Sequence, residues 1–203
     1  MSDPVKLAII YYSSTGTVDA MARHAAKMAE KAGAEVRLRH VEELAPRSMI
    51  EAEDEWLEHR KAVEHEPTAV PDDVVWADTV LFGTPARFGN VASQLKHFID
   101  ALGPQWRRGL LADKTYAGFT AAQTAHGGHE STLLALYNTI HHFGGVVVPP
   151  GYTDEIKFEE GNPYGVSQVD QHDTEKPLTD VASEALTHLV ERLVSITERL
   201  GRE

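Results

Sequence analysis

The feature that most constrains the fold is an alternation, repeated along the chain, of short apolar runs with stretches of helical spacing. The apolar runs are rich in β-branched and aromatic residues, which is typical of strands covered on both faces of a parallel sheet. Strands are predicted at residues 6–12, 34–41, 78–85, 114–122 and 144–150. Amphipathic helices are predicted at residues 18–32, 91–102, 131–143 and 178–200.

Strands that alternate with helices predict the α/β class, and here a three-layer α/β/α sandwich with right-handed connections. We expect a flavodoxin-like five-stranded parallel sheet in the order 2-1-3-4-5, with ligands gathering at the carboxyl ends of strands one, three and four. The length of 203 residues, 42% of them hydrophobic, predicts a single domain over residues 1–203. Residues 45–70 and 151–177 show no clear pattern of either kind.

Composition narrows the possible partners. The formal net charge of -12 opposes binding to nucleic acid, which usually depends on clustered Lys and Arg. The chain has no cysteine, which excludes disulfides, thiolate metal sites and a cysteine nucleophile. No apolar run approaches about 18 residues and no basic-then-apolar leader follows Met1, so we expect no membrane span and a cytoplasmic location. The acidic stretch 51–66 predicts a solvated helix or a mobile excursion.

The loop after the first strand, "SSTGTV" at residues 13–18, predicts a phosphate site. The first N–H groups of the following helix point back toward the end of the sheet, the side chains offer several hydroxyls, and Gly16 permits a close backbone approach. The loop matches neither the dinucleotide nor the nucleoside-triphosphate glycine pattern and contains no lysine, which favours a monophosphate. The alternative is that Thr17 only caps the helix and the hydroxyls face water.

Two further loops are predicted at the same edge of the sheet. In "GTPARFGN", residues 83–90, backbone amides near Arg87 and Phe88 suit the polar edge of a flat heterocycle, and Arg87 suits negative charge that develops on such a ring. The alternative is a Gly/Pro turn with a core Phe and a solvent-facing Arg. The small side chains of "TAAQTAHGGHES", residues 120–131, leave room for a ring to lie against the backbone.

The roles of several histidines and of Trp106 are a separate question. His126 and His129 lack a third ligand nearby, so we predict no metal site. His142 is either a functional residue or part of ordinary packing at a helix C-terminus. Trp106, in "GPQWRRG", is either a buried plug or an exposed aromatic platform.

In combination, these motifs resemble the flavodoxin-like FMN proteins, and specifically the tryptophan-repressor-binding-protein (WrbA-type) family of NAD(P)H:quinone oxidoreductases. The resemblance covers nearly the whole chain. It is carried, in order, by "YYSSTGT", "FGTPARFGN", "QWRRG", "AHGGHE", "HHFGGVVVPPGY" and "NPYG".

The resemblance implies a set of site residues. The FMN phosphate site is implied to comprise Ser13, Ser14, Thr15, Gly16, Thr17 and Val18. The flavin ring is implied to lie between Ala86, Arg87 and Phe88 on one side and Thr120, Ala121, Ala122, Gln123, Thr124 and Ala125 on the other. His142 resembles the family's histidine near the flavin and Trp106 its aromatic wall of the substrate pocket, while Thr15 stands where some members place a tyrosine near the nicotinamide.

The resemblance also implies an activity. FMN, held without a covalent bond, would accept hydride from NADH or NADPH and pass two electrons to a quinone. Arg87 or the surrounding amides would stabilise the reduced anionic ring, and His142 would orient the quinone or nicotinamide and supply a proton. The family's pocket is shared between subunits of a tetramer, so we expect a homotetramer in which Trp106 walls a neighbour's flavin. No DNA binding is implied.

Three departures and two alternatives remain. Ala86 replaces a frequent Thr, "TAAQTA" lacks the family's Ser-Thr-Gly-rich character, and the stretch 51–66 is longer and more charged than usual. A flavodoxin-type electron carrier without nicotinamide activity is the first alternative, and a flavin-free adaptor domain is the second. A phosphoryl-accepting receiver is disfavoured because the first strand does not end in paired acidic residues.

Overall fold

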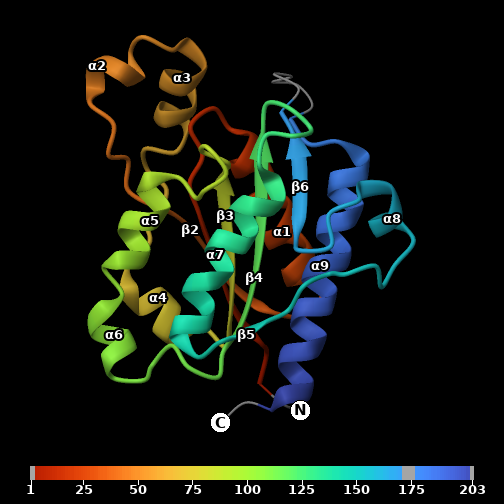
Figure 1. Cartoon of the computed structure of the whole chain (residues 1–203). Coiled ribbons are helices and arrows are strands. Elements are labelled where there is room, and N and C mark those ends of the chain that lie inside the picture. Colours follow the sequence, from red (N-terminus) through yellow and green to blue (C-terminus); the bar gives the residue numbers. More distant parts are fainter. Residues whose placement is uncertain (1–2, 171–176, 202–203) are drawn as a thin grey trace.

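The computed structural model describes residues 3–170 and 177–201 and alternates strands with helices (Figure 1). The strands are β1 (Lys6–Tyr11), β2 (Glu35–His40), β3 (Thr79–Pro85), β4 (Thr115–Ala122), β5 (Val146–Val147) and β6 (Val166–Val169). The helices are α1 (Thr17–Lys31), α2 (Arg47–Ile50), α3 (Asp54–Ala62), α4 (Pro71–Trp76), α5 (Ser93–Asp100), α6 (Gly103–Arg107), α7 (His129–Phe143), α8 (Ile156–Glu160) and α9 (Asp180–Leu200).

The strands pair in parallel in the order β2-β1-β3-β4-β5, which confirms the predicted flavodoxin-like topology. Successive side chains of a strand point to opposite faces, so β1 contributes to two cores. Leu7 and Ile9 pack with α1 and α9, whereas Ala8 and Ile10 pack with α4, α5 and α7. All four side chains are fully buried, and the sheet therefore forms the middle of three layers (Figure 1).

The fifth strand differs from the prediction. Only Val146 and Val147 of the expected strand at 144–150 pair with β4, because Pro149 and Pro150 have no N–H to donate and end the ladder. The chain then makes an excursion that contains α8 and returns as β6, which pairs with β4 from Phe119 to Ala122. β6 lies in the stretch 151–177 that showed no clear pattern, and residues 171–176 of that stretch are outside the described residues.

A buried ion pair holds the start of β6. Lys157 is fully buried and donates to a carboxylate oxygen of Glu160 and, at 2.9 Å, to the carbonyl oxygen of Gly165. Glu160 also accepts from the backbone N–H groups of Asn162 at 3.0 Å and Ser167 at 2.7 Å. Burial lowers the pKa of Lys157, against the raising effect of Glu160. The pair satisfies the backbone of the turn that places β6 beside β4.

None of the helices in the described ranges is both long and apolar enough to cross a membrane.

Replacing Lys157 by Met is expected to lower the free energy of unfolding by about 3–5 kcal/mol, because Glu160 is left buried without its counter-charge. Urea unfolding followed by circular dichroism measures the change. Lys27→Met, on the exposed side of α1, is the control and should stay within about 0.5 kcal/mol of the parent. A loss at position 157 no larger than that of the control would show that the pair does not hold this excursion.

Candidate functional site

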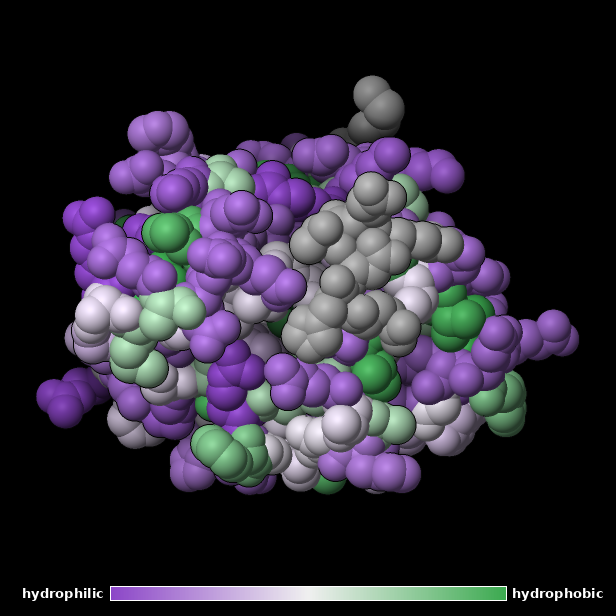
Figure 2. Space-filling view, turned by 90° about the horizontal axis from the view of Figure 1, so that it is seen from above, coloured by the Kyte–Doolittle hydropathy of each residue, from purple (hydrophilic) through white to green (hydrophobic). Residues whose placement is uncertain are grey.

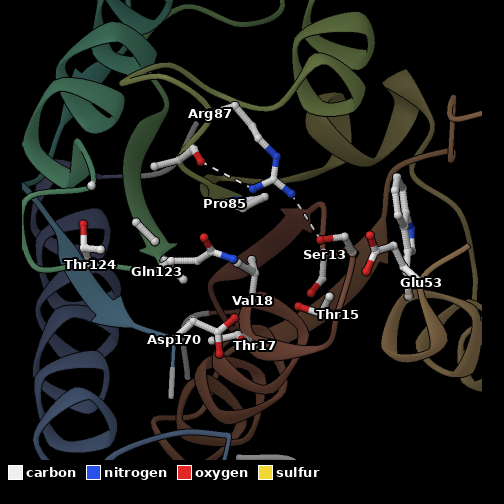
Figure 3. Close-up of a pocket in the computed structure, with 16 residues that line it drawn as sticks. Ser13, Thr15, Thr17, Val18, Glu53, Pro85, Arg87, Gln123, Thr124 and Asp170 are labelled. Carbon is white, nitrogen blue, oxygen red and sulfur yellow. Dashed lines mark hydrogen bonds between the residues drawn. The ribbon is translucent and has the colours of Figure 1, made fainter. Parts of the chain in front are cut away.

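A cavity of about 530 Å³ lies at the carboxyl ends of β1, β3 and β4 (Figure 3). This volume is in the range of small-molecule sites, and the place is where open α/β sheets bind ligands. Figure 2 views this end of the molecule, where hydrophilic residues predominate and hydrophobic ones form scattered patches. The lining residues are Ser13, Ser14, Thr15, Thr17, Val18, Glu53, Trp56, Pro85, Ala86, Arg87, Ala121, Ala122, Gln123, Thr124, Gly127 and Asp170.

The loop after β1 presents an open helix end to this cavity. α1 begins at Thr17, and its N-cap is Gly16, whose φ of 107° is a conformation that side chains of L-residues rarely adopt. The hydroxyl oxygen of Ser13 accepts from the Gly16 N–H at 3.1 Å. No side chain in the described part of the chain caps α1. The first N–H groups of the helix therefore remain for a ligand, and Thr17 is a residue of the first turn rather than its cap.

The loop after β3 is a tight turn that carries Arg87. The Arg87 N–H donates to the Asn90 carbonyl at 2.8 Å and the Asn90 N–H returns the bond at 3.1 Å. Nη2 of Arg87 donates to the Ser14 hydroxyl oxygen at 3.2 Å, which connects this loop to the loop after β1 (Figure 3). Phe88 has a φ of 52° and a fully exposed side chain outside the cavity. Neither predicted alternative, a core Phe or an Arg directed only at solvent, describes this turn.

The loop after β4 faces Arg87 from the other side of the cavity. It is tied to the loop after β3 by the Ala86 N–H, which donates to the Ala121 carbonyl at 2.8 Å. The predicted residues Ala121, Ala122, Gln123 and Thr124 all line the cavity. The exposed residue Ala125 is not among the lining residues.

Two other residues of the segment 120–131, Thr120 and His129, hold the loop in place without lining the cavity. Thr120 is fully buried, and its hydroxyl donates to the Thr84 carbonyl at 2.7 Å, so its side chain joins two strands instead of facing the cavity. Nε2 of His129 is 3.1 Å from the Thr124 carbonyl oxygen, so the imidazole anchors the loop. Within residues 3–170 and 177–201, no group of three or more His, Asp or Glu side chains is arranged to hold a metal ion.

Trp106 and His142 lie together, but away from the cavity. Nε1 of Trp106 donates to the His142 carbonyl at 2.7 Å. His142 is in the last turn of α7, and the helix begins at His129 beside the cavity. At 1.5 Å per residue, this separates His142 from the cavity end of the helix by about 20 Å. Trp106 is half exposed in α6, at the opposite end of the sheet (Figure 1). One chain alone does not bring these two residues to the site, and their roles stay predictions.

Comparison with known proteins agrees with this geometry. The family model described as NADPH-dependent FMN reductase matches residues 5–155. The chain is 46% identical to a Deinococcus radiodurans protein named NAD(P)H dehydrogenase (quinone), over 98% of this chain and 99% of that protein. The chain therefore belongs to the family of NADPH-dependent FMN reductases that this model describes. A Sinorhizobium fredii member with the same name is 37% identical over 89% of this chain and 90% of its own. The predicted family resemblance is thus confirmed.

Solved structures support the family's fold in this chain. A flavodoxin, WrbA-like protein from Agrobacterium tumefaciens superimposes with a TM-score of 0.66 at 20% identity, covering 97% of this chain and 99% of that one. The two-electron reduced flavodoxin of Megasphaera elsdenii gives 0.56 at 18% identity, covering 93% of this chain and 98% of that one. At these identities the comparison concerns the fold.

This family member has lining residues that the sequence analysis missed. Glu53 and Trp56 reach the cavity from the connection between β2 and β3, and Asp170 reaches it from the end of β6. The stretch 51–66 was expected to be a solvated helix or a mobile excursion, and most of α3 is indeed exposed. Trp56, however, is only partly exposed. An indole within an otherwise charged stretch was the available signal that one side of this helix packs against the molecule.

Glu43 fixes this connection to the sheet. One carboxylate oxygen accepts from Tyr12 Oη at 2.9 Å and from Trp56 Nε1 at 3.0 Å. The other accepts from Gln94 Nε2 at 2.8 Å and from the N–H groups of the next two residues of the chain at 2.9 Å each. Burial by itself would raise the pKa of Glu43, but these hydrogen bonds outweigh it and hold the pKa below its usual value. The carboxylate therefore joins β1, α5 and α3.

Glu43→Gln is expected to destabilise the protein at pH 7 by about 1–3 kcal/mol, because an amide cannot accept at both positions and places donors against donors. Since the folded pKa of Glu43 is lowered, its contribution is complete above the unfolded pKa of about 4.3 and is lost as pH falls through the folded value. Urea unfolding at pH 7 and at lower pH should therefore show the parent and the variant converging in acid.

The matched control is Glu42→Gln, an exposed neighbour whose replacement should change little at either pH. If the free-energy difference between parent and Glu43→Gln is the same at all pH values, the ionised carboxylate is not what holds the connection.

Proposed function

We propose that the protein is an FMN-dependent NAD(P)H:quinone oxidoreductase that transfers two electrons from NADH or NADPH to a quinone. The observation that carries this function is the cavity at the end of the sheet, which combines an uncapped helix N-terminus, several hydroxyls and a narrow space between two loops. Two of its relatives named NAD(P)H dehydrogenase (quinone) each match 98% of the chain. The family model names FMN.

The phosphate end of the cavity fits the terminal phosphate of FMN. The dipole of the 15-residue helix α1 is positive at its start and favours an anion there by about 0.3–2 kcal/mol. Hydroxyls of Ser13, Ser14, Thr15 and Thr17 add donors beside the free N–H groups. No lysine is among the described residues that line the cavity, and the donors together suit one phosphate better than a triphosphate.

The other end of the cavity fits a flat ring. Ala86 and Arg87 stand on one side and Ala122, Gln123 and Thr124 on the other, with the hydrogen bond between the two loops fixing the width of the space. Phe88, Thr120 and Ala125 are not among the lining residues, and the Thr120 side chain lies behind the lining, so contacts of these three residues with a flavin stay predictions.

FMN, when bound, supplies the acceptor and donor of hydride. Three charged residues line the described part of the cavity: Arg87, Glu53 and Asp170. Arg87 carries the positive charge among them and stabilises negative charge at the ring edge. Its bond to Ser14 holds the guanidinium in place before a ligand arrives. We place Thr15 near the nicotinamide. Since both substrates must reach the same cavity, they are expected to bind in turn.

We further propose a homotetramer in which Trp106 and His142 border the cavity of another subunit. The proposal is supported by their shared position far from their own cavity and by large exposed apolar side chains on the surface that α6 and α7 help to form. Those exposed side chains are Trp106, Leu134 and Val146. A cytoplasmic location is also a proposal, supported by the absence of cysteine.

The function is tested by reconstituting the purified protein with FMN, removing the excess and recording the visible spectrum. Bound flavin should lose its colour with NADH or NADPH without oxygen and regain it with benzoquinone. Bound flavin that ignores both nucleotides would favour the electron carrier. A protein that retains no flavin would favour the adaptor domain.

His142→Ala is expected to lower kcat with a quinone by about ten- to a hundredfold, if the imidazole orients the acceptor and supplies a proton. The Kd for FMN should change much less, because the residue is remote from the phosphate end. Steady-state kinetics and flavin titration measure the two quantities separately. His141→Ala, the adjacent exposed histidine, is the control. Unchanged turnover in His142→Ala would remove this residue from the mechanism.

A further inference from the structure

α3 borders the phosphate loop on the side opposite the ring. In the sheet order, β3 and β4 lie on one side of β1 and β2 lies on the other, so the connection after β2 reaches the loop from that other side. Glu53 and Trp56 line the cavity together with Ser13 and Thr15. A Cβ atom on Gly16 would lie 3.7 Å from Nδ1 of His59, one turn further along α3. The segment thus follows the loop along most of its length.

This wall is held in place. The indole of Trp56 donates to Glu43, which is itself held by Tyr12 and Gln94. Behind the indole, a cavity of only about 20 Å³ lies between α3 and the ends of β1 and β2. A single water requires at least about 10–15 Å³, so this space does not allow the ring to withdraw. The indole therefore has no room to move back toward the sheet.

The start of this wall is acidic, whereas the basic residues of α3, His59, Arg60 and Lys61, lie in its last turn. The Glu53 side chain lies beside Ser13 and Thr15 at the edge of the cavity (Figure 3). The first turn of α3 adds Asp54 and Glu55. A phosphate bound in the loop satisfies the helix N-terminus, but a second phosphate further out would meet carboxylates in place of donors.

We propose that α3 makes the site selective for a flavin mononucleotide over a flavin dinucleotide, with Trp56 and Glu53 as the residues that determine this specificity. The inference rests on the proposed function, because it takes the ring to lie toward β3 and β4. The adenylate of a dinucleotide is attached to the phosphate end, away from the ring, and so it points at α3. Trp56 obstructs it by volume and Glu53 repels its second phosphate by charge.

The test compares the dissociation constants for FMN and FAD, obtained by titrating apoprotein into each flavin and following flavin fluorescence. The parent should bind FMN more tightly than FAD. Trp56→Ala should lower the FAD-to-FMN ratio of dissociation constants by about tenfold, because the dissociation constant for FAD falls by more than that for FMN changes. Glu53→Gln should lower the ratio by about two- to fivefold, and this effect should shrink at high salt because the charge is exposed.

Glu58→Gln is the matched control, since it removes one exposed carboxylate of the same helix that does not line the cavity and should leave the ratio unchanged. If Trp56→Ala does not fold, Trp56→Leu keeps an apolar side chain against the sheet and should still lower the ratio. A merely structural role of α3 would weaken both flavins together and leave the ratio constant.

The inference is overturned if the Trp56 and Glu53 variants keep the parent's FAD-to-FMN ratio of dissociation constants. It is also overturned if Trp56→Ala weakens FAD more than FMN, which would mean that the indole holds the adenine. A parent protein that binds neither flavin contradicts the proposed function itself. A parent that binds FMN and catalyses quinone reduction, with a ratio unaffected by these substitutions, contradicts only the role of α3.

Discussion

The unsatisfied N–H groups at the start of α1 are the constraint on which the rest of the site depends. β1 is buried on both faces, so the position and direction of its end are set by two cores. Gly16, with its positive φ, turns the chain directly into the helix, and no described side chain takes the place of a cap. Free helix donors favour an anion from the ligand. The loops after β3 and β4 then define the space that extends from that anion.

Two carboxylates, that of Glu43 partly buried and that of Glu160 buried, organise the connections around this end of the sheet. Glu43 holds the α3 connection through five hydrogen bonds, and Glu160 holds the excursion before β6 together with Lys157. Both are costly to bury and are stable only with their donors in place. These connections deliver Trp56 and Asp170 to the cavity. The acidic stretch thus has a structural reason for its path, although most of its side chains face water.

Neither Trp106 nor His142 is among the described residues that line the cavity within one chain. Nε1 of Trp106 donates to the His142 carbonyl at the far end of α7, so the two residues lie side by side there. Their distance from their own cavity follows from helix geometry alone. A site completed by a neighbouring copy would join the binding of substrate to the assembly of subunits.

The sequence by itself determined the order of the five predicted strands and the four main helices, the hydroxyl-rich loop after β1, and the loops after β3 and β4. Each of these follows from local signals, such as an apolar run before a hydroxyl-rich turn at Ser13 or a Gly-Pro turn at Arg87. Only the tertiary structure decided that β6 continues the sheet, that Trp56 faces the cavity and that His142 does not. β6 is stabilised by pairing with β4, Trp56 is directed by a carboxylate from another connection, and His142 is separated from the cavity by the length of α7. These placements depend on contacts between residues distant in the chain, and no local pattern of hydrophobicity or turn chemistry records such contacts.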